Sequence, residues 1–238
     1  MTTAVATDEL NLDSISFTDY RELLLPVGRA VFEDFPQGEL DEQAGPAYFE
    51  GLGLSRWIFW KRVADVIKLL PSDGGRCLDF GCGFGLLTPL LSDRFSQVTN
   101  IDFKPELANR FLQRWSATHG QSFANVDFAT DLNEANLEDH SIDLMLALDV
   151  LEHVDDLDEL LAHMHRLLKP NGKFIVTGPT ENSVYKLGRR IVGFSGDYHE
   201  RSIYDIEDAM KQYFDFRIVG RIGFPLTLFH VLVAQPLK

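Results

Sequence analysis

Cysteine is scarce in this chain of 238 residues, which contains only two, Cys77 and Cys82. Disulfide-stapled domains and structural zinc sites need several suitably spaced cysteines, so the sequence argues against both classes. A long apolar run is also missing, because the longest, over residues 222–234, is short for a membrane span and contains Pro225 and His230. The first residues lack the basic and apolar regions of a signal peptide. We therefore expect a soluble cytoplasmic protein without an integral membrane segment.

Positive charge is scarce as well. The chain has 36 Asp and Glu residues against 22 Lys and Arg residues, a formal net charge of −14. Residues 115–165 hold 12 acidic residues and no Lys or Arg. Binding to nucleic acid depends on Lys and Arg contacts to phosphates, so we expect no nucleic-acid partner. Hydrophobic residues make up 45% of the chain, which is typical of a folded globular protein, and the length suits one large domain or a domain with an extension.

Strands and helices alternate along most of the chain. The apolar patterns predict strands over 76–80, 97–102, 126–129, 142–148, 173–177, 217–220 and 228–234. They predict helices over 54–70, 86–95, 105–119, 157–168, 184–192 and 203–213. In the first of these helices, Arg62, Asp65 and Lys68 lie outside the apolar face. The alternation predicts an α/β fold with a mostly parallel sheet and helices on both faces, preceded by an acidic, proline-interrupted arm that is irregular or forms short helices.

The strongest motif is a glycine-rich loop between a strand and a helix. Gly81, Gly83 and Gly85 follow the first predicted strand, where the chain must turn tightly and let a ligand approach the backbone. Asp102 ends the next strand, 21 residues after Gly81. In folds of this kind a carboxylate at that place accepts hydrogen bonds from ribose hydroxyls. The two features together predict a cofactor that contains a ribose.

Two further residues indicate which cofactor the loop binds. The glycine spacing is G-x-G-x-G and the next position is Leu86, unlike the dinucleotide pattern G-x-G-x-x-G/A. Asp79 lies two residues before the first glycine, where a carboxylate would repel a pyrophosphate but attract a ligand that carries an ammonium and a sulfonium. The loop therefore favours S-adenosylmethionine, and an NAD-dependent oxidoreductase is the disfavoured interpretation.

With these motifs the sequence resembles the class I S-adenosylmethionine-dependent methyltransferases, especially the broad group that acts on small molecules, over about residues 50–235. The resemblance rests on the segments 78–85, 100–103, 141–154 and 167–176. It implies a Rossmann-like sheet of seven mostly parallel strands, with an antiparallel C-terminal hairpin, helices on both faces and an N-terminal helical lid. Residues 1–50 would be the acidic arm or lid and 51–238 the methyltransferase domain, with a lid insertion at 181–215.

The resemblance also implies a set of residues that bind the cofactor. That set is Asp79, Gly81, Gly83, Asp102, Phe103, Asp131, Leu132 and Leu148. The residues in and before the glycine loop would lie beside the methionine part, and the acid and aromatic ring after the second strand would take the ribose and the adenine. The pair after the third strand would contact the adenine amino group and ring, and the last residue would lie next to the sulfonium.

A hydroxyl acceptor must lose its proton during methyl transfer, so a base is expected at the site. His153 follows the fourth strand, at the edge of the sheet where ligands bind, and is the candidate base, assisted by Glu152 or His199. The alternative is that the Glu-His pair is a structural turn element and that His199 is a surface or capping residue. A weaker alternative makes Asp149, Glu152 and His153 ligands of a hard divalent metal, although no fourth ligand is identifiable.

The sequence is thus interpreted as an S-adenosylmethionine-dependent methyltransferase that acts on a small, fairly apolar acceptor, with O-methylation of a hydroxyl favoured. N- or C-methylation and a non-catalytic cofactor-binding module are the alternatives. The acidic stretch over 115–165 borders the expected site and disfavours strongly anionic acceptors.

Weaker candidates for lining the acceptor pocket are Tyr185 and Tyr198. Tyr48 and Arg56 could reach the cofactor's carboxylate, although packing and surface roles are favoured for them. The aromatic residues Trp57, Phe59 and Trp60 are interpreted as packing, with a roof over an apolar acceptor as the alternative. Lys186, Arg189 and Arg190 form a basic helix face that is typically solvated but could meet an anionic substrate or lipid surface.

Overall fold

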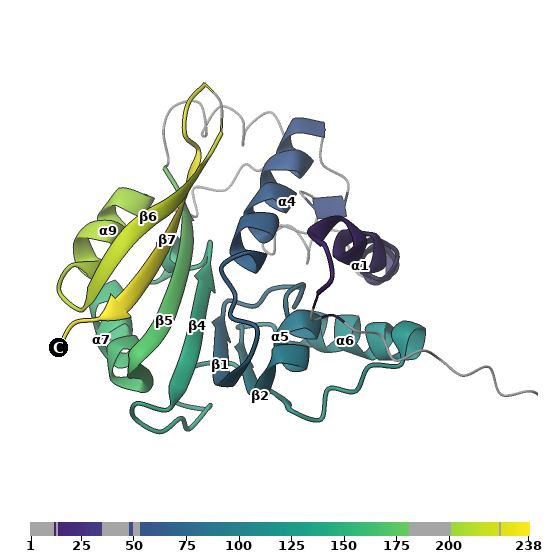
Figure 1. Cartoon of the computed structure of the whole chain (residues 1–238), viewed down its shortest axis with the longest axis horizontal. Helices are drawn as coiled ribbons and strands as arrows, with labels where there is room; N and C mark the ends of the chain where they lie inside the picture. The colour runs from purple at the N-terminus through teal and green to yellow at the C-terminus, as the bar shows by residue number, and fades with distance from the viewer. Residues whose placement is uncertain (1–11, 13, 35–47, 50–52, 181–200, 224) are drawn as a thin grey trace, which may run out of the picture.

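A computed structural model describes residues 12, 14–34, 48–49, 53–180, 201–223 and 225–238 of the chain (Figure 1). Within these residues, seven strands form one sheet in the order β3-β2-β1-β4-β5-β7-β6. The strands are β1 (Gly74–Phe80), β2 (Phe95–Ile101), β3 (Val126–Ala129), β4 (Ile142–Leu148), β5 (Leu168–Pro179), β6 (Phe214–Ile222) and β7 (Phe229–Pro236). The first five are parallel, and β7 runs antiparallel to both β5 and β6. The predicted mostly parallel sheet with an antiparallel C-terminal hairpin is confirmed.

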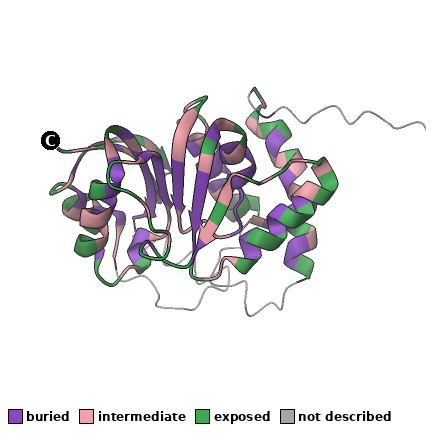
Figure 2. Ribbon diagram, turned by 90° about the horizontal axis from the view of Figure 1, so that it is seen from below, coloured by how far each residue is buried: buried purple, intermediate pink, exposed green. Residues whose placement is uncertain are grey.

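The central strands are buried on both faces because helices cover both sides of the sheet (Figure 2). In β4, Leu144 and Leu146 join one hydrophobic cluster, whereas Met145 and Ala147 join the other. The first cluster lies under α1 (Phe17–Glu33), α4 (Gly53–Ile67), α5 (Thr88–Arg94) and α6 (Glu106–His119). The second lies under α7 (Leu157–Leu167), α9 (Ile203–Met210) and the short 3₁₀ helix η2 (Leu151–His153). None of the described helices is long and apolar enough to span a membrane.

The N-terminal arm is more regular than its prolines suggest. Over residues 17–33 it is one helix of 17 residues, α1, which contains Pro26. A proline inside a helix costs about 3 kcal/mol, but Tyr20, Leu24 and Val31 recur at helical spacing and bury their side chains in the first cluster. The Tyr20 hydroxyl also donates a hydrogen bond to the carbonyl of Leu86, at 2.6 Å. The expectation of an irregular or short-helical arm is therefore wrong for this segment, because tertiary packing outweighs the proline.

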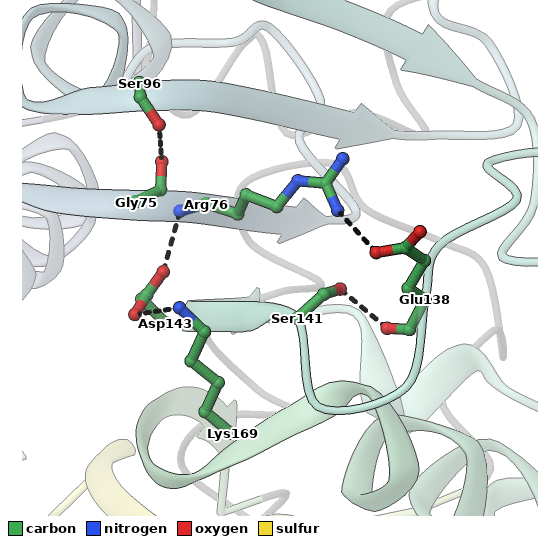
Figure 3. A network of polar contacts seen from close by, with 7 residues as sticks. All are labelled: Gly75, Arg76, Ser96, Glu138, Ser141, Asp143 and Lys169. Carbon is green, nitrogen blue, oxygen red and sulfur yellow. Dashed lines mark hydrogen bonds and ion pairs between the residues drawn. The ribbon is translucent and has the colours of Figure 1, made fainter.

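The amino-terminal edge of the sheet is closed by polar contacts around Asp143 (Figure 3). Its carboxylate accepts a hydrogen bond from the backbone N–H of Arg76 at 2.8 Å and one from Lys169 Nζ at 2.7 Å. Burial opposes the charged form, but these two donors hold the pKa of Asp143 below its ordinary value. This edge is occupied by structural contacts, whereas the glycine loop lies at the opposite, carboxyl edge, where open α/β sheets bind ligands.

Candidate functional site

The glycine loop after β1 needs glycine for geometric reasons. Gly81, Gly83 and Gly85 have φ of +75°, +53° and +68°, in the left-handed region that favours glycine. A Cβ atom on Gly81 would lie 2.5 Å from the side chain of Val150, so the loop packs closely against the segment after β4. A Cβ atom on Gly83 would meet nothing within 4 Å. The loop is thus closed on the side of β4 and open at Gly83, where a ligand can approach the backbone.

Asp102, directly after β2, ties the end of that strand to the glycine loop. Its Oδ2 accepts a hydrogen bond from the backbone N–H of Gly83 at 2.8 Å, and its Oδ1 accepts one from the backbone N–H of Lys104 at 3.0 Å. The residue is 7% exposed. A carboxylate oxygen has two lone pairs and can accept more than one hydrogen bond. The carboxylate is therefore held in place by the backbone of the loop, and its contact with a ribose stays a prediction.

Asp79, on β1, is a buried carboxylic acid beside this loop, 3% exposed. Its pKa is raised to about 7, because burial disfavours the charged form and the Asp102 carboxylate repels it. A cationic ligand placed here would relieve both effects. The glycine loop and the two acids therefore fit a ligand that is positive at one end and carries ribose hydroxyls farther along, which is the chemistry of S-adenosylmethionine.

The raised pKa of Asp79 predicts that binding of S-adenosylmethionine depends on pH. Only the ionised acid attracts the cation, so affinity is expected to rise about eightfold between pH 6 and pH 7.5. Calorimetric titrations at the two pH values measure this change, and Asp79→Asn should bind weakly at both. Equal affinities of the unaltered protein at the two values would contradict the assignment.

The folding stability of the ligand-free protein should fall as the pH rises, whereas the affinity for S-adenosylmethionine should increase. The acid keeps its proton up to about pH 7 when folded but loses it near pH 4 when unfolded, so the folded state binds more protons between those values. The stability from this group is complete below about pH 4 and is lost as the pH rises toward 7. The Asp79→Asn variant should lack this loss, which thermal melts of the ligand-free proteins would reveal.

The residues expected near the adenine lie at the ends of β2 and β3. Phe103 is 62% exposed, and Nζ of Lys104 lies 5.2 Å from the centroid of its ring. Asp131 is exposed, and its Oδ1 accepts hydrogen bonds from the backbone N–H groups of Asn133 and Glu134, at 2.7 and 2.9 Å. Leu132 is buried, and together with Asp131 it lines a shallow cavity of about 220 Å³ beside the start of α7. Their contacts with the adenine stay a prediction.

The turn after β4 carries the candidate base and the three residues of the metal alternative. Leu148 ends the strand, and Asp149 follows with φ of +54°. The Asp149 carboxylate accepts a hydrogen bond from the Thr177 hydroxyl at 2.9 Å and forms an ion pair with Arg62, whereas Glu152 is buried and His153 exposed. Within the described ranges, no three His, Cys, Asp or Glu side chains gather as metal ligands do. The metal alternative stays a prediction.

Arg62 of α4 contacts the turn after β4, and the sequence pattern wrongly predicts that it is solvated. The helical pattern puts it outside the apolar face, but it is 4% exposed. Its guanidinium carbon lies 4.2 Å from the ring centroid of Phe59 and 4.4 Å from that of Phe229, and Nη2 donates to the Tyr48 hydroxyl at 3.4 Å. Burial raises the pKa of Tyr48 while Arg62 lowers it. The partner of Arg62, Asp149, lies far away in sequence, so no local pattern reveals the burial.

The other residues predicted to line the site divide into three groups. Trp60 is buried in packing, and its Nε1 donates to the Tyr48 carbonyl at 3.2 Å, whereas Trp57 is 52% exposed. Arg56 is exposed. His199 and the candidates Tyr185, Tyr198, Lys186, Arg189 and Arg190 lie outside the described residues, as does the part of the expected lid insertion over 181–200.

Comparisons with known proteins agree with this geometry. Residues 78–176 match the protein family described as methyltransferase domain. The chain is 36% identical over 119 residues to the ubiquinone biosynthesis O-methyltransferase of Xanthomonas oryzae, which covers 49% of this chain and 48% of that protein. It is 30% identical over 131 residues to the sterol 4-C-methyltransferase of Caenorhabditis elegans, which covers 55% of this chain and 39% of that protein. The chain thus spans about half the length, or less, of these curated relatives.

A solved structure with the same fold contains the demethylated form of the expected cofactor. The magnesium protoporphyrin IX methyltransferase of Synechocystis PCC 6803, solved with bound S-adenosylhomocysteine, has a TM-score of 0.62 against this structure. The sequences are 18% identical, and the match covers 92% of this chain and 98% of that one. At this identity the likeness concerns the fold.

Proposed function

We propose that the chain, whose residues 78–176 match the methyltransferase-domain family, is a class I S-adenosylmethionine-dependent methyltransferase that methylates a hydroxyl of a small, fairly apolar acceptor. The observation that carries the proposal is the arrangement of Asp79, Asp102 and the open glycine loop at the carboxyl edge of the sheet. When bound there, S-adenosylmethionine supplies a methyl carbon that its sulfonium has already activated, and S-adenosylhomocysteine is the product.

The chain's own residues then have to hold the two reactants in line and take up a proton. Asp79 and Asp102 position the cofactor from either side of the loop, and much of the rate of such a transfer comes from positioning. His153 is exposed on η2, directly after β4, at the carboxyl edge of the sheet where the glycine loop also lies. A neutral histidine can remove the hydroxyl proton near pH 7. We assign the proton acceptor to His153, with Glu152 buried beside it in the same turn.

The absence of Lys and Arg between 115 and 165 supports a neutral acceptor, because this stretch includes β4, η2 and most of α7. An anionic acceptor would meet repulsion from the acids of these elements. C-methylation is the second candidate, since one relative is named as a sterol 4-C-methyltransferase. The proposal of O-methylation depends on the base, and the two reactions therefore differ in how strongly they depend on His153.

Replacing His153 with alanine is expected to lower turnover of a hydroxyl acceptor about a hundredfold, because a positioned base contributes at least that factor. Affinity for S-adenosylhomocysteine should stay nearly unchanged, since His153 is not among the residues expected to bind the cofactor. Steady-state kinetics and calorimetry measure the two quantities. His165→Ala is the matched control, because that histidine lies at the end of α7 and its Nε2 contacts the carbonyl of Leu237 at 3.1 Å. Normal turnover in His153→Ala would sink the base assignment and favour N- or C-methylation.

A further inference from the structure

The short helix after the glycine loop, α5, is tied to the sheet near both of its ends by a hydroxyl and an amide. At its start, Oγ1 of Thr88 accepts a hydrogen bond from Nδ2 of Asn100 on β2 at 2.9 Å, and both residues are 0% exposed. Toward its end, the Ser92 hydroxyl donates to Oδ1 of Asn125 at 2.7 Å. A helix of seven residues needs such contacts, because it is too short to be stable alone.

The two amides differ in whether their polar atoms are paired. Nδ2 of Asn125 donates to the carbonyls of Ser92 and Phe95, at 2.9 and 2.8 Å, so both ends of that amide have partners. Oδ1 of Asn100 is fully buried and has no hydrogen-bond partner among the described residues. Exchanging the oxygen and nitrogen of this amide would leave the nitrogen unpaired instead. Because buried polar atoms are normally paired, the amide of Asn100 indicates a place for a small hydrogen-bonding ligand.

The pair of Asn100 and Thr88 lies directly beneath the glycine loop. The backbone N–H of Thr88 donates to the carbonyl of Gly85 at 3.0 Å, and a Cβ atom on Gly85 would lie 3.1 Å from Oγ1 of Thr88. The N–H of Gly85 in turn donates to the carbonyl of Cys82 at 2.8 Å. The hydroxyl that Asn100 holds therefore supports the third glycine, and the shape of the loop depends on the amide below it.

The side chain of Asn100 also shares a face of the sheet with that of Asp79. The two residues are partners in the parallel register of β1 and β2. Two residues earlier on the same strands, Cys77 and Val98 are also partners, and both belong to the first hydrophobic cluster. Side chains two residues apart on a strand point to the same face, and adjacent strands lie about 4.8 Å apart. One water molecule can bridge side chains at that separation.

The groups around the Asn100 amide determine what can donate to its oxygen. Phe128, its register partner on β3, is apolar, and the ionised Asp102, two residues further on, offers only acceptor oxygens. The Thr88 hydroxyl accepts from Nδ2 and keeps one hydrogen to donate. A water bound to Oδ1, to this hydroxyl and to the carboxyl group of Asp79 would have three polar partners, as buried waters typically do.

We infer that Asn100 is a positioning residue of the cofactor site, which fixes the glycine loop through Thr88 and binds one buried water between its Oδ1 and the carboxyl group of Asp79. The water donates one hydrogen to Oδ1 and, once Asp79 has lost its proton, the other to the carboxylate. It thereby stabilises the ionised acid that attracts the cation of the cofactor. The inference rests on the part of the proposed function that concerns S-adenosylmethionine, and not on the choice of acceptor.

Asn100→Leu tests both roles, because leucine has a similar branched shape but can hold neither Thr88 nor the water. Without the water, the pKa of Asp79 should rise by about one pH unit, the effect of one hydrogen bond to a charged group. Calorimetric titrations with S-adenosylmethionine then give a ratio of unaltered to variant affinity about tenfold larger at pH 6 than at pH 9. The titration of the ligand itself affects both proteins equally and cancels in this ratio. A ratio that does not change with pH would overturn the inference, since a purely structural role lowers the affinity equally at every pH.

Further variants separate the two roles. Thr88→Val removes the link to the loop and should lower the affinity about tenfold at both pH values. Asn125→Leu is the matched control, because it breaks the equivalent pair at the other end of α5 and should lower the melting temperature without changing the affinity of the folded protein.

If Asn100→Leu does not fold, Asn100→Ser replaces it. The serine hydroxyl still binds the water but is too short to reach Thr88, so a loss of affinity that grows toward low pH in this variant would contradict the inference. If the unaltered protein binds S-adenosylmethionine and Asn100→Leu shows the expected pH dependence, but no hydroxyl acceptor is methylated, the proposed O-methylation fails while the inference stands.

Discussion

Replacing Asp102 with alanine is expected to weaken binding of S-adenosylhomocysteine about a thousandfold. The carboxylate would accept hydrogen bonds from the ribose hydroxyls, and hydrogen bonds to a charged group contribute about 1.5–3 kcal/mol each. Two such bonds total roughly 4 kcal/mol, which is close to a thousandfold in affinity. The substitution also leaves the backbone N–H groups of Gly83 and Lys104 without their carboxylate acceptor, so the loop is less well ordered before binding.

Calorimetry on the unaltered protein and the variant measures the loss, with thermal melts to establish that the variant is folded. Asp127→Ala is the matched control. Asp127 lies on the neighbouring strand β3, where its carboxylate accepts a hydrogen bond from Gln97 at 2.6 Å on the protein surface. Its removal should change the affinity by less than a factor of two. If Asp102→Ala bound as well as this control, the ribose would have to be recognised elsewhere.

The parts of the fold that could be predicted from the sequence are those whose burial follows a local period. The apolar run over 142–148 gives β4 with the same bounds, because a central parallel strand is buried on both faces and needs no alternation. The glycine loop and Asp102 were equally predictable, since tight turns and strand ends leave marks in the sequence itself. Local chemistry was therefore enough to place the cofactor side of the candidate site.

The acceptor side could not be predicted in this way, because its contacts join distant segments. The sequence pattern indicates a solvated helix position for Arg62, whereas in the fold Arg62 forms an ion pair with Asp149. His230 lies in an apolar stretch of the sequence, whereas in the fold it contacts Glu207. The positive φ of Asp149 also leaves no signal in the sequence, because most aspartates have a negative φ and the residue type alone does not mark the exception. These contacts depend on how the helices dock on the sheet, which the sequence specifies only through the whole core.

The ion pair between Arg62 and Asp149 leads to the second large effect. Arg62→Met is expected to lower the free energy of unfolding by about 3 kcal/mol, because removing one partner of a buried pair leaves the other charge without compensation. Urea denaturation measures the change. The neighbouring Lys61→Met on the same helix is the control. Lys61 also pairs with an acid, Asp65, but its side chain is 39% exposed, and exposed pairs contribute about 0.5 kcal/mol.

The double variant Arg62→Met with Asp149→Asn tells whether the loss comes from charge or from packing. If the uncompensated carboxylate is responsible, neutralising it should restore most of the stability, since buried pairs replaced by neutral groups of similar size are often no less stable. If the loss instead reflects the position of the guanidinium between the rings of Phe59 and Phe229, the second substitution will restore little. We expect restoration, because methionine is flexible enough to fill the space between two aromatic rings. Since Asp149 begins the turn that carries His153, the pair also makes the docking of α4 and the shape of that turn depend on each other.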